Sequence, residues 1–114
     1  MQPSSVNDCG VLIDYAVEII AEHGRSNAVV EIAMDADHRY RIGVSMSYSY
    51  GGFGWAPSMS GHSFETYADA LNAGIHVLLK HWHRPFPSDP ASVHAELHQL
   101  HEQVLARRRQ PSLF

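Results

Sequence analysis

Residues 39–55 read RYRIGVSMSYSYGGFGW, and this stretch decides how the sheet is arranged. Large apolar or aromatic side chains stand at every second position from Tyr40 to Tyr50, with arginine, glycine and serine between them. A period of two over this length indicates one long β-strand with a single apolar face. Gly51 and Gly52 then interrupt the alternation, which predicts a tight hairpin turn.

A shorter strand is predicted before the long one. Residues 28–34 show the same alternation, and the sequence Asp-Ala-Asp-His at residues 35–38 is typical of a turn. The two strands should therefore run antiparallel, with their apolar side chains on one face of the sheet. The expected pairs are Met34 with Tyr40, Ile32 with Ile42 and Val30 with Val44.

The strand after the glycines is predicted to complete a second hairpin. A two-residue turn at Gly51 and Gly52 pairs Tyr50 with Phe53. In this register the facing pairs are apolar on one side of the sheet and small on the other. A slip by two residues would keep both faces, whereas a slip by one would mix them. Pro57 cannot donate to a neighbouring strand, so we expect this third strand at an edge.

Apolar residues at helical spacing predict three helices. The first is expected over residues 5–24, between a capping box and a glycine stop. The second is expected over residues 63–84, where prolines follow, and the third begins after a cap at residue 88 or 89. The outer side of the first helix would carry three carboxylates spaced four residues apart, those of Asp14, Glu18 and Glu22.

Together these elements predict a single α+β domain over residues 1–114, in the order helix, three strands, helix, helix. A three-stranded antiparallel sheet would carry the helices on one face. The first five elements resemble a double-stranded-RNA-binding domain in their order only. Such domains carry a basic cluster at the start of their second helix, where residues 62–66 here read HSFET, so the resemblance implies no RNA-binding residues. Residues 110–114 are expected to form a frayed tail.

Composition narrows the classes of function. The 114 residues are 45% hydrophobic and 18% charged, which is typical of a globular domain. The net charge of −4 argues against general affinity for a phosphate backbone. The single cysteine, Cys9, permits no intrachain disulfide, and its place on the predicted first helix indicates a buried thiol. Neither a signal peptide nor a membrane span is indicated, so we expect a cytoplasmic protein.

The aromatic end of the second hairpin is the first candidate site. The long strand spans roughly 40 Å at about 3.3 Å per residue, whereas a helix of about 20 residues covers only about 30 Å. The end of the hairpin could therefore project beyond the helices and offer aromatic anchors to a protein partner. The alternative is that the second helix covers these rings as part of the core. The residues concerned are Tyr48, Tyr50, Phe53 and Trp55.

The acidic N-terminal part is the second candidate. Up to Asp37 the chain has seven acidic residues and one basic residue. On the predicted first helix, Asp14, Glu18 and Glu22 could present an acidic surface to a basic protein partner, such as a nuclease. The alternative is the ordinary solvated face of an amphipathic helix.

A face of small residues is the third candidate. Gly43, Ser45, Ser47 and Ser49 alternate with the apolar side chains of the long strand and would lie on the opposite face. A second copy of the chain could pack closely against this surface and form a homodimer. The alternative is the solvent face of a sheet that is covered on one side.

Three histidines are the fourth candidate. His94, His98 and His101 are separated by four and three residues, so they align on one side of the third helix. Two histidines one turn apart can bind zinc or another divalent metal, and a third strengthens the site. The alternative is a polar border row beside the core. The glutamate of a His-Glu-x-x-His metalloprotease is not present, so hydrolysis is not indicated.

Binding rather than catalysis is the expected function. No spacing of serine, histidine and acid singles out a catalytic set, and no cofactor is indicated. We expect a small non-enzymatic protein-interaction module, of the kind that bacteria or phages encode as inhibitors or immunity factors. One alternative is a histidine-based domain that binds a divalent metal. Another is a nucleic-acid-binding domain that uses the hairpin aromatics together with Arg39, Arg41 and residues 107–109.

Overall fold

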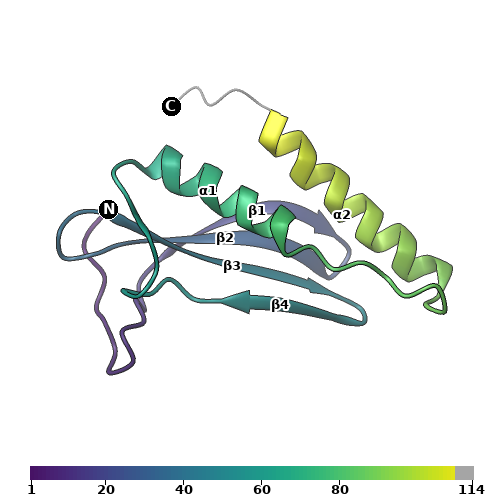
Figure 1. The fold of residues 1–114 in the computed structure, drawn as a ribbon, viewed down its shortest axis with the longest axis horizontal. Helices are drawn as coiled ribbons and strands as arrows, with labels where there is room; N and C mark the ends of the chain where they lie inside the picture. The colour runs from purple at the N-terminus through teal and green to yellow at the C-terminus, as the bar shows by residue number, and fades with distance from the viewer. Residues whose placement is uncertain (110–114) are drawn as a thin grey trace.

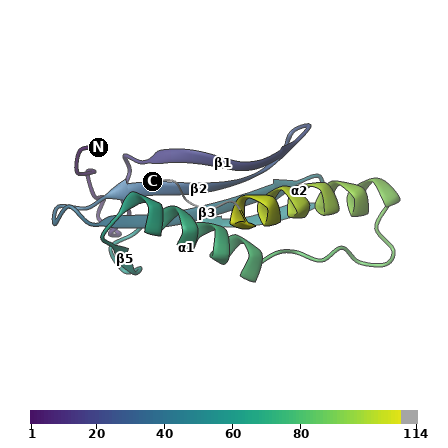
Figure 2. The same ribbon diagram turned by 90° about the horizontal axis from the view of Figure 1, so that it is seen from above.

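In the part of the chain that the structure describes, residues 1–109, two helices lie on one face of an antiparallel sheet (Figure 1, Figure 2). In this computed structural model, side chains are described for residues 1–108. The strands lie in the order β1-β2-β3-β4, and the short strand β5 pairs with β3. The elements are β1 (Ala16–His23), β2 (Ser26–Met34), β3 (Tyr40–Tyr48), β4 (Gly51–Trp55), β5 (Ser63–Phe64), α1 (Tyr67–Lys80) and α2 (Ala91–Arg109).

The predicted α+β class is confirmed, as is an antiparallel sheet with helices packed on one face. The predicted three strands are wrong, because the described residues form a sheet of five. The predicted element order is also wrong. A strand, not a helix, is the first regular element, so the order that resembled a double-stranded-RNA-binding domain is not the observed one. The predicted tail at residues 110–114 lies outside the described residues.

The predicted helix over residues 5–24 is replaced by an irregular segment and strand β1. Residues 1–15 run irregularly and form only isolated bridges, while β1 pairs antiparallel with β2. Gly24 turns the chain between these strands at a φ of 61°, a left-handed conformation that glycine adopts without strain. The prediction of a helix was wrong because the apolar residues of this segment fit both the spacing of a helix and the alternation of a strand. Three β-branched residues in this segment favour a strand, namely Val17, Ile19 and Ile20.

The central hairpin of β2 and β3 matches its predicted register. Met34 faces Tyr40, Ile32 faces Ile42 and Val30 faces Val44. The side chains of β2 and β3 that point toward the helices form the floor of the core, and Val30, Ile32 and Val44 are fully buried. The predicted register is therefore correct for the two strands whose apolar pattern is strictest.

The β3–β4 hairpin has the predicted faces but a different register. Val44 faces Trp55, which is four residues before the partner that a Gly51-Gly52 turn would give it. The turn lies at Ser49 and Tyr50, and both glycines belong to β4. A slip by an even number of residues leaves every side chain on its original face, so the apolar pattern is satisfied in either register.

Gly43 explains why β4 stops at Trp55. Residues 55–57 cross over Gly43, where an added Cβ would collide with the carbonyl oxygen of Trp55 and with the ring nitrogen of Pro57. Only glycine allows this approach of two backbone segments. The chain then leaves the sheet, and β5 pairs with the same edge of β3 farther along, where Tyr40 faces Phe64. Strand β4 is last in the order β1-β2-β3-β4, so its predicted place at an edge is confirmed.

Both helices follow their apolar stripes. Thr66 caps α1 by accepting a hydrogen bond from the backbone nitrogen of Asp69 at 3.0 Å. The start predicted at Ser63 is wrong, because Ser63 belongs to β5. Helix α1 packs on β2 and β3, and α2 packs on β1 and β2. The predicted stripe of α2 is buried in the core, and it consists of Val93, Leu97, Leu100 and Val104.

The N-terminal segment contradicts the prediction that Cys9 is buried on a helix. Cys9 is exposed in a turn of this segment rather than buried on a helix. The segment crosses one end of the sheet, where Leu12 is fully buried and its backbone nitrogen donates to the carbonyl oxygen of Pro57. Among the described residues, neither helix has the length and apolar content that a membrane crossing requires.

Candidate functional site

Figure 2 shows both helices on one side of the sheet, which leaves the opposite face without a helix over it. Exposed apolar side chains lie along β1 on this face. Val17 faces Glu31 and Ile19 faces Val29 across the β1–β2 pair. These positions alternate with core residues, so they point away from the helices. Ile13 and Tyr15 lie in the irregular segment just before β1 and are exposed as well. We call these four residues, which are between 41% and 55% exposed, the apolar row: Ile13, Tyr15, Val17 and Ile19.

Carboxylates flank the apolar row. Asp14 lies between Ile13 and Tyr15 in the sequence and is exposed, with its Oδ2 accepting a hydrogen bond from the backbone nitrogen of Ser5 at 3.0 Å. Glu22 pairs with Asn27 just beyond Ile19, after a bulge in the strand. Glu31 is half-buried beside Val17, and burial raises the pKa of its carboxyl group. The uncovered part of β1 therefore combines apolar and acidic side chains.

The acidic surface predicted from Asp14, Glu18 and Glu22 is not formed by a helix. Glu18 points to the other side of the sheet, where its Oε1 accepts a hydrogen bond from the hydroxyl of Tyr67 at 2.6 Å. This contact and burial raise the pKa of Tyr67. Asp14 and Glu22 remain exposed, Asp14 in the segment before β1 and Glu22 near the other end of this strand.

The free edge of β1 is partly covered by side chains of α2. Gln103 bonds both backbone groups of Glu22, since its Oε1 accepts from the nitrogen at 2.9 Å and its Nε2 donates to the carbonyl oxygen at 2.8 Å. Arg107 donates to the carbonyl oxygen of Ile19 at 3.2 Å. These bonds occupy groups that a further strand would need, which directs any contact to the face of β1 rather than to this part of its edge.

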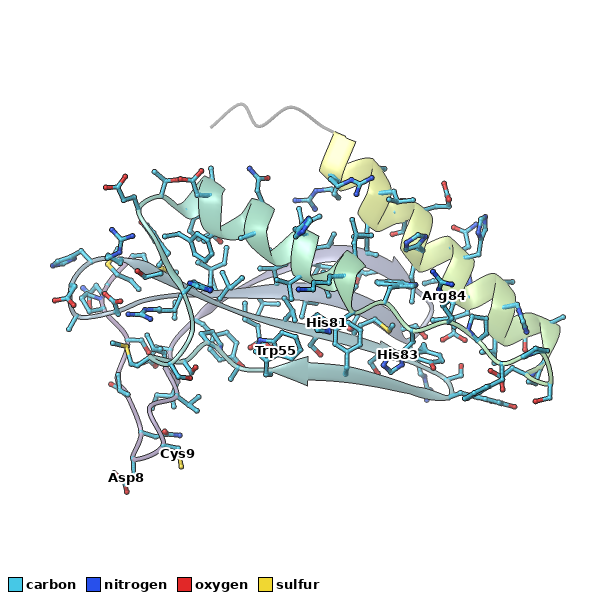
Figure 3. All side chains as sticks on the ribbon, viewed as in Figure 1. Asp8, Cys9, Trp55, His81, His83 and Arg84 are labelled. Carbon is cyan, nitrogen blue, oxygen red and sulfur yellow. The ribbon has the colours of Figure 1, made fainter. Side chains whose placement is uncertain are left out.

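Aromatic side chains of β3 and β4 pack against two histidines that follow α1. The rings of Phe53 and His83 are 5.1 Å apart, and those of Trp55 and His81 are 5.4 Å apart in an edge-to-face arrangement. The hydroxyl of Tyr48 lies 3.4 Å from Nδ1 of His83. Figure 3 shows Trp55, His81 and His83 gathered beneath the end of α1. The connection after α1, not the helix itself, thus covers the hairpin.

The predicted aromatic site is divided by this cover. Tyr48 and Phe53 are half-buried and belong to the rim of the core. Trp55 is 46% exposed, and Tyr50, in the turn, is 59% exposed. Three of the four aromatics share one face, but Tyr50 stands apart from their contacts with the histidines.

The predicted homodimer face is not a continuous surface. Gly43 is buried beneath residues 55–57, and Ser45 is half-buried. Ser49 is tied to Glu96 of α2, whose Oε1 and Oε2 accept from its nitrogen and hydroxyl, each at 2.8 Å. Ser47 alone of the four is an exposed residue of a strand.

The predicted histidine row lines a cavity of about 510 Å³ between the end of α1, the connection after it and α2. The cavity has apolar walls formed by Leu79, Trp82, Pro85 and Leu97. Its polar lining consists of Lys80, His83, Arg84, His94, His98 and His101. No carboxylate is among its described lining residues. Sequence spacing found the three histidines of α2, but the cationic residues come from elements that only the fold brings beside them.

Two of these histidines have defined roles in packing. Nε2 of His94 lies 3.0 Å from the carbonyl oxygen of Phe86, to which it can only donate. The ring of His101 lies 5.3 Å from that of Trp82. Within residues 1–108, no group of three or more His, Cys, Asp or Glu side chains is placed to hold a metal ion.

Two buried carboxylates were not predicted. Glu96 accepts hydrogen bonds from Ser26 and Ser49, which tie α2 to the β1–β2 and β3–β4 hairpins. Asp35 forms an ion pair with Arg41, 2.8 Å from Nε to Oδ2. Burial alone would raise the pKa of each carboxyl, but the hydrogen bonds outweigh burial, so both pKa values are lowered. The sequence pattern did not predict the hydrogen-bond partners of Asp35 and Glu96, because a polar residue in a turn or helix is expected to face solvent.

Comparison with known proteins adds no functional assignment, because no protein-family model, curated protein or solved structure matches this chain.

Proposed function

We propose that this protein is a small interaction module that binds another protein through the apolar row and the carboxylates beside it. The observation that carries the proposal is the exposure of four apolar side chains, between 41% and 55% each, two of which, Val17 and Ile19, lie on the sheet face opposite the helices. A contiguous apolar patch with polar margins is typical of a protein interface.

The charge around the patch defines the partner. Asp14 and Glu22 are exposed, and the pKa of Glu31 is raised by burial beside Val17. A partner with an apolar centre and basic margins would pair with these carboxylates and speed association. A second copy of the chain would instead bring like charges together, so a basic protein fits this surface better than a homodimer does.

An inhibitor or immunity factor is the biological role that we assign to such a module. Proteins that act on nucleic acids carry basic surfaces, and an acidic partner can occupy those surfaces. The nucleic-acid-binding alternative has less support, because Arg39 donates to the Ser63 hydroxyl at 2.7 Å and Arg41 donates to Asp35 at 2.8 Å. Both guanidinium groups are thus engaged within the fold.

Capture with the immobilised protein from a bacterial lysate tests the proposal when matched variants are compared. We expect wild-type protein to retain a basic protein, and Ile19→Ser to lose it. Phe86→Ser is the control, since Phe86 is an exposed apolar side chain, 72% accessible, in the connection between the helices. The captured protein should be released by salt, because rim charges are screened. Equal capture by Ile19→Ser and wild type would contradict the proposal.

A further inference from the structure

We propose that the cavity between α1, its following connection and α2 binds a small organic anion that carries a phosphate group. Residues of α1 and α2 line this cavity on the helix side of the sheet, whereas Val17 and Ile19 of the apolar row lie on the opposite face of β1. The two proposals therefore fail or succeed separately.

Charge is the first argument for an anion. Lys80 and Arg84 bring fixed positive charges to the cavity, and both side chains are exposed to solvent. Imidazole groups of His83, His98 and His101 add hydrogen-bond donors to the lining. Because no carboxylate is among the described lining residues, nothing there offsets this charge. Guanidinium and ammonium groups are the side chains that proteins use most often for phosphate oxygens.

The same charges argue against a divalent cation. A metal ion coordinated by His98 and His101 would lie in a cavity that Lys80 and Arg84 also line, where like charge opposes its binding. His94 is already engaged with the carbonyl oxygen of Phe86 at 3.0 Å. The histidine row is thus better matched to an anion than to the metal that its spacing suggested.

Size and lining indicate an organic ligand rather than a free ion. The cavity volume of about 510 Å³ lies within the usual range for small-molecule sites. Trp82, Leu79 and Leu97 offer apolar surface on which a ring or short chain can lie. An apolar wall beside a cationic margin favours a molecule that has an apolar part and an anionic part.

The end of α1 does not oppose this assignment strongly. A helix C-terminus carries partial negative charge on its free carbonyl groups. Here the nitrogen of His81 donates to the carbonyl of Val77 at 3.1 Å, and that of Trp82 donates to the carbonyl of Leu79 at 3.4 Å. Two of the terminal carbonyls are therefore bonded, and the ammonium group of Lys80 lies in the same turn.

Fluorescence of Trp82 provides the test, with phenyl phosphate as the probe. The background variant is Trp55→Phe, which leaves Trp82 as the single tryptophan. We expect a saturable change in emission with phenyl phosphate. The responses to phenol, which has only the ring, and to inorganic phosphate, which has only the phosphate, should be much weaker. In the same background, Arg84→Ala should weaken binding about tenfold, the effect of losing one charge-assisted hydrogen bond.

Arg25→Ala is the matched control, because it removes an equal charge from the exposed turn between β1 and β2. It should bind as the background variant does. The proposal is overturned if the folded protein gives no saturable response up to about 10 mM phenyl phosphate, or if Arg84→Ala and Arg25→Ala bind alike. A saturable response to zinc chloride without one to phenyl phosphate would also overturn it. Histidine proton shifts of the wild-type chain, followed by NMR during the same titration, give a second measurement that needs no substitution of Trp55.

Discussion

Gln103 of α2 forms two hydrogen bonds with the backbone of Glu22 and so takes the place of a neighbouring strand at the edge of β1. The distances are 2.9 Å from the nitrogen of Glu22 to Oε1 and 2.8 Å from Nε2 to the carbonyl oxygen. An adjoining antiparallel strand would offer the same pair of one acceptor and one donor. Free sheet edges invite pairing with other chains, and natural sheets often cover them.

Replacing Gln103 with leucine should expose this edge. The change removes two hydrogen bonds, each worth about 1 kcal/mol, and leaves the backbone of Glu22 open to another chain. We expect a loss of about 1–2 kcal/mol in the free energy of unfolding and greater self-association, measured by urea denaturation and sedimentation velocity. Gln99→Leu, at an exposed position of the same helix, is the control. If the two variants behave alike, the edge is not held by Gln103.

Truncation of Val17 and Ile20 should distinguish strand β1 from the helix that the sequence suggests. In the strand, Ile20 is 5% exposed in the core, whereas Val17 is 54% exposed on the opposite face. We expect Ile20→Ala to cost about 2–5 kcal/mol and Val17→Ala less than about 1 kcal/mol. On the predicted helix both side chains would be buried. Urea denaturation showing equal, large losses would therefore contradict the strand.

The strength of the apolar pattern decides which parts of the fold can be predicted. Residues 28–34 and 40–48 alternate strictly and are joined by a short turn, so their register follows from the sequence. The β3–β4 register does not, because an even slip leaves apolar side chains on one face and small ones on the other. Residues 13–20 satisfy the spacing of a strand and of a helix, and the pairing with β2 decides between them.

The candidate sites show the same limit. The spacing of His94, His98 and His101 correctly places them on one side of a helix, and all three line the cavity. Lys80 and Arg84 led us to propose an anionic ligand in place of a metal cation, yet these two residues lie outside the helix that carries the histidines. The exposure of Val17 could not be predicted while this residue was assigned to the apolar side of a helix.

Adding a methyl group at Gly43 should test the crossing of residues 55–57. A Cβ there would collide with backbone atoms of Trp55 and Pro57, which cannot move aside as a flexible side chain can. We expect Gly43→Ala to destabilise the protein by about 1–3 kcal/mol, the usual cost of overpacking, measured by thermal unfolding. Gly61→Ala is the control, because the nearest atom to its Cβ would be at an ordinary 3.6 Å. Equal melting temperatures for the two variants would show that β4 does not end in this way.

Acid should destabilise the protein through Asp35 and Glu96. Hydrogen bonds lower the pKa of both carboxyl groups in the folded state, so the folded state binds protons less readily than the unfolded state does. Their stabilisation is present above the pH at which unfolded carboxyl groups titrate, about 4, and is lost as pH falls through the lowered folded values. Glu31 acts in the opposite sense, because burial raises its pKa. We therefore expect the free energy of unfolding to fall between about pH 5 and pH 2.

Glu96→Gln separates the contribution of α2 from that of Asp35. The amide keeps the size of the side chain but replaces the charged carboxylate, whose oxygens accept from the hydroxyls of Ser26 and Ser49, with a neutral group. We expect a loss of about 1–3 kcal/mol at pH 7, a smaller loss at pH 3 and a flatter dependence of stability on pH. Glu102→Gln, at an exposed position of the same helix, should retain the wild-type dependence. Denaturant titrations at several pH values measure all three proteins, and an unchanged slope in Glu96→Gln would show that this buried carboxylate does not govern the acid limb.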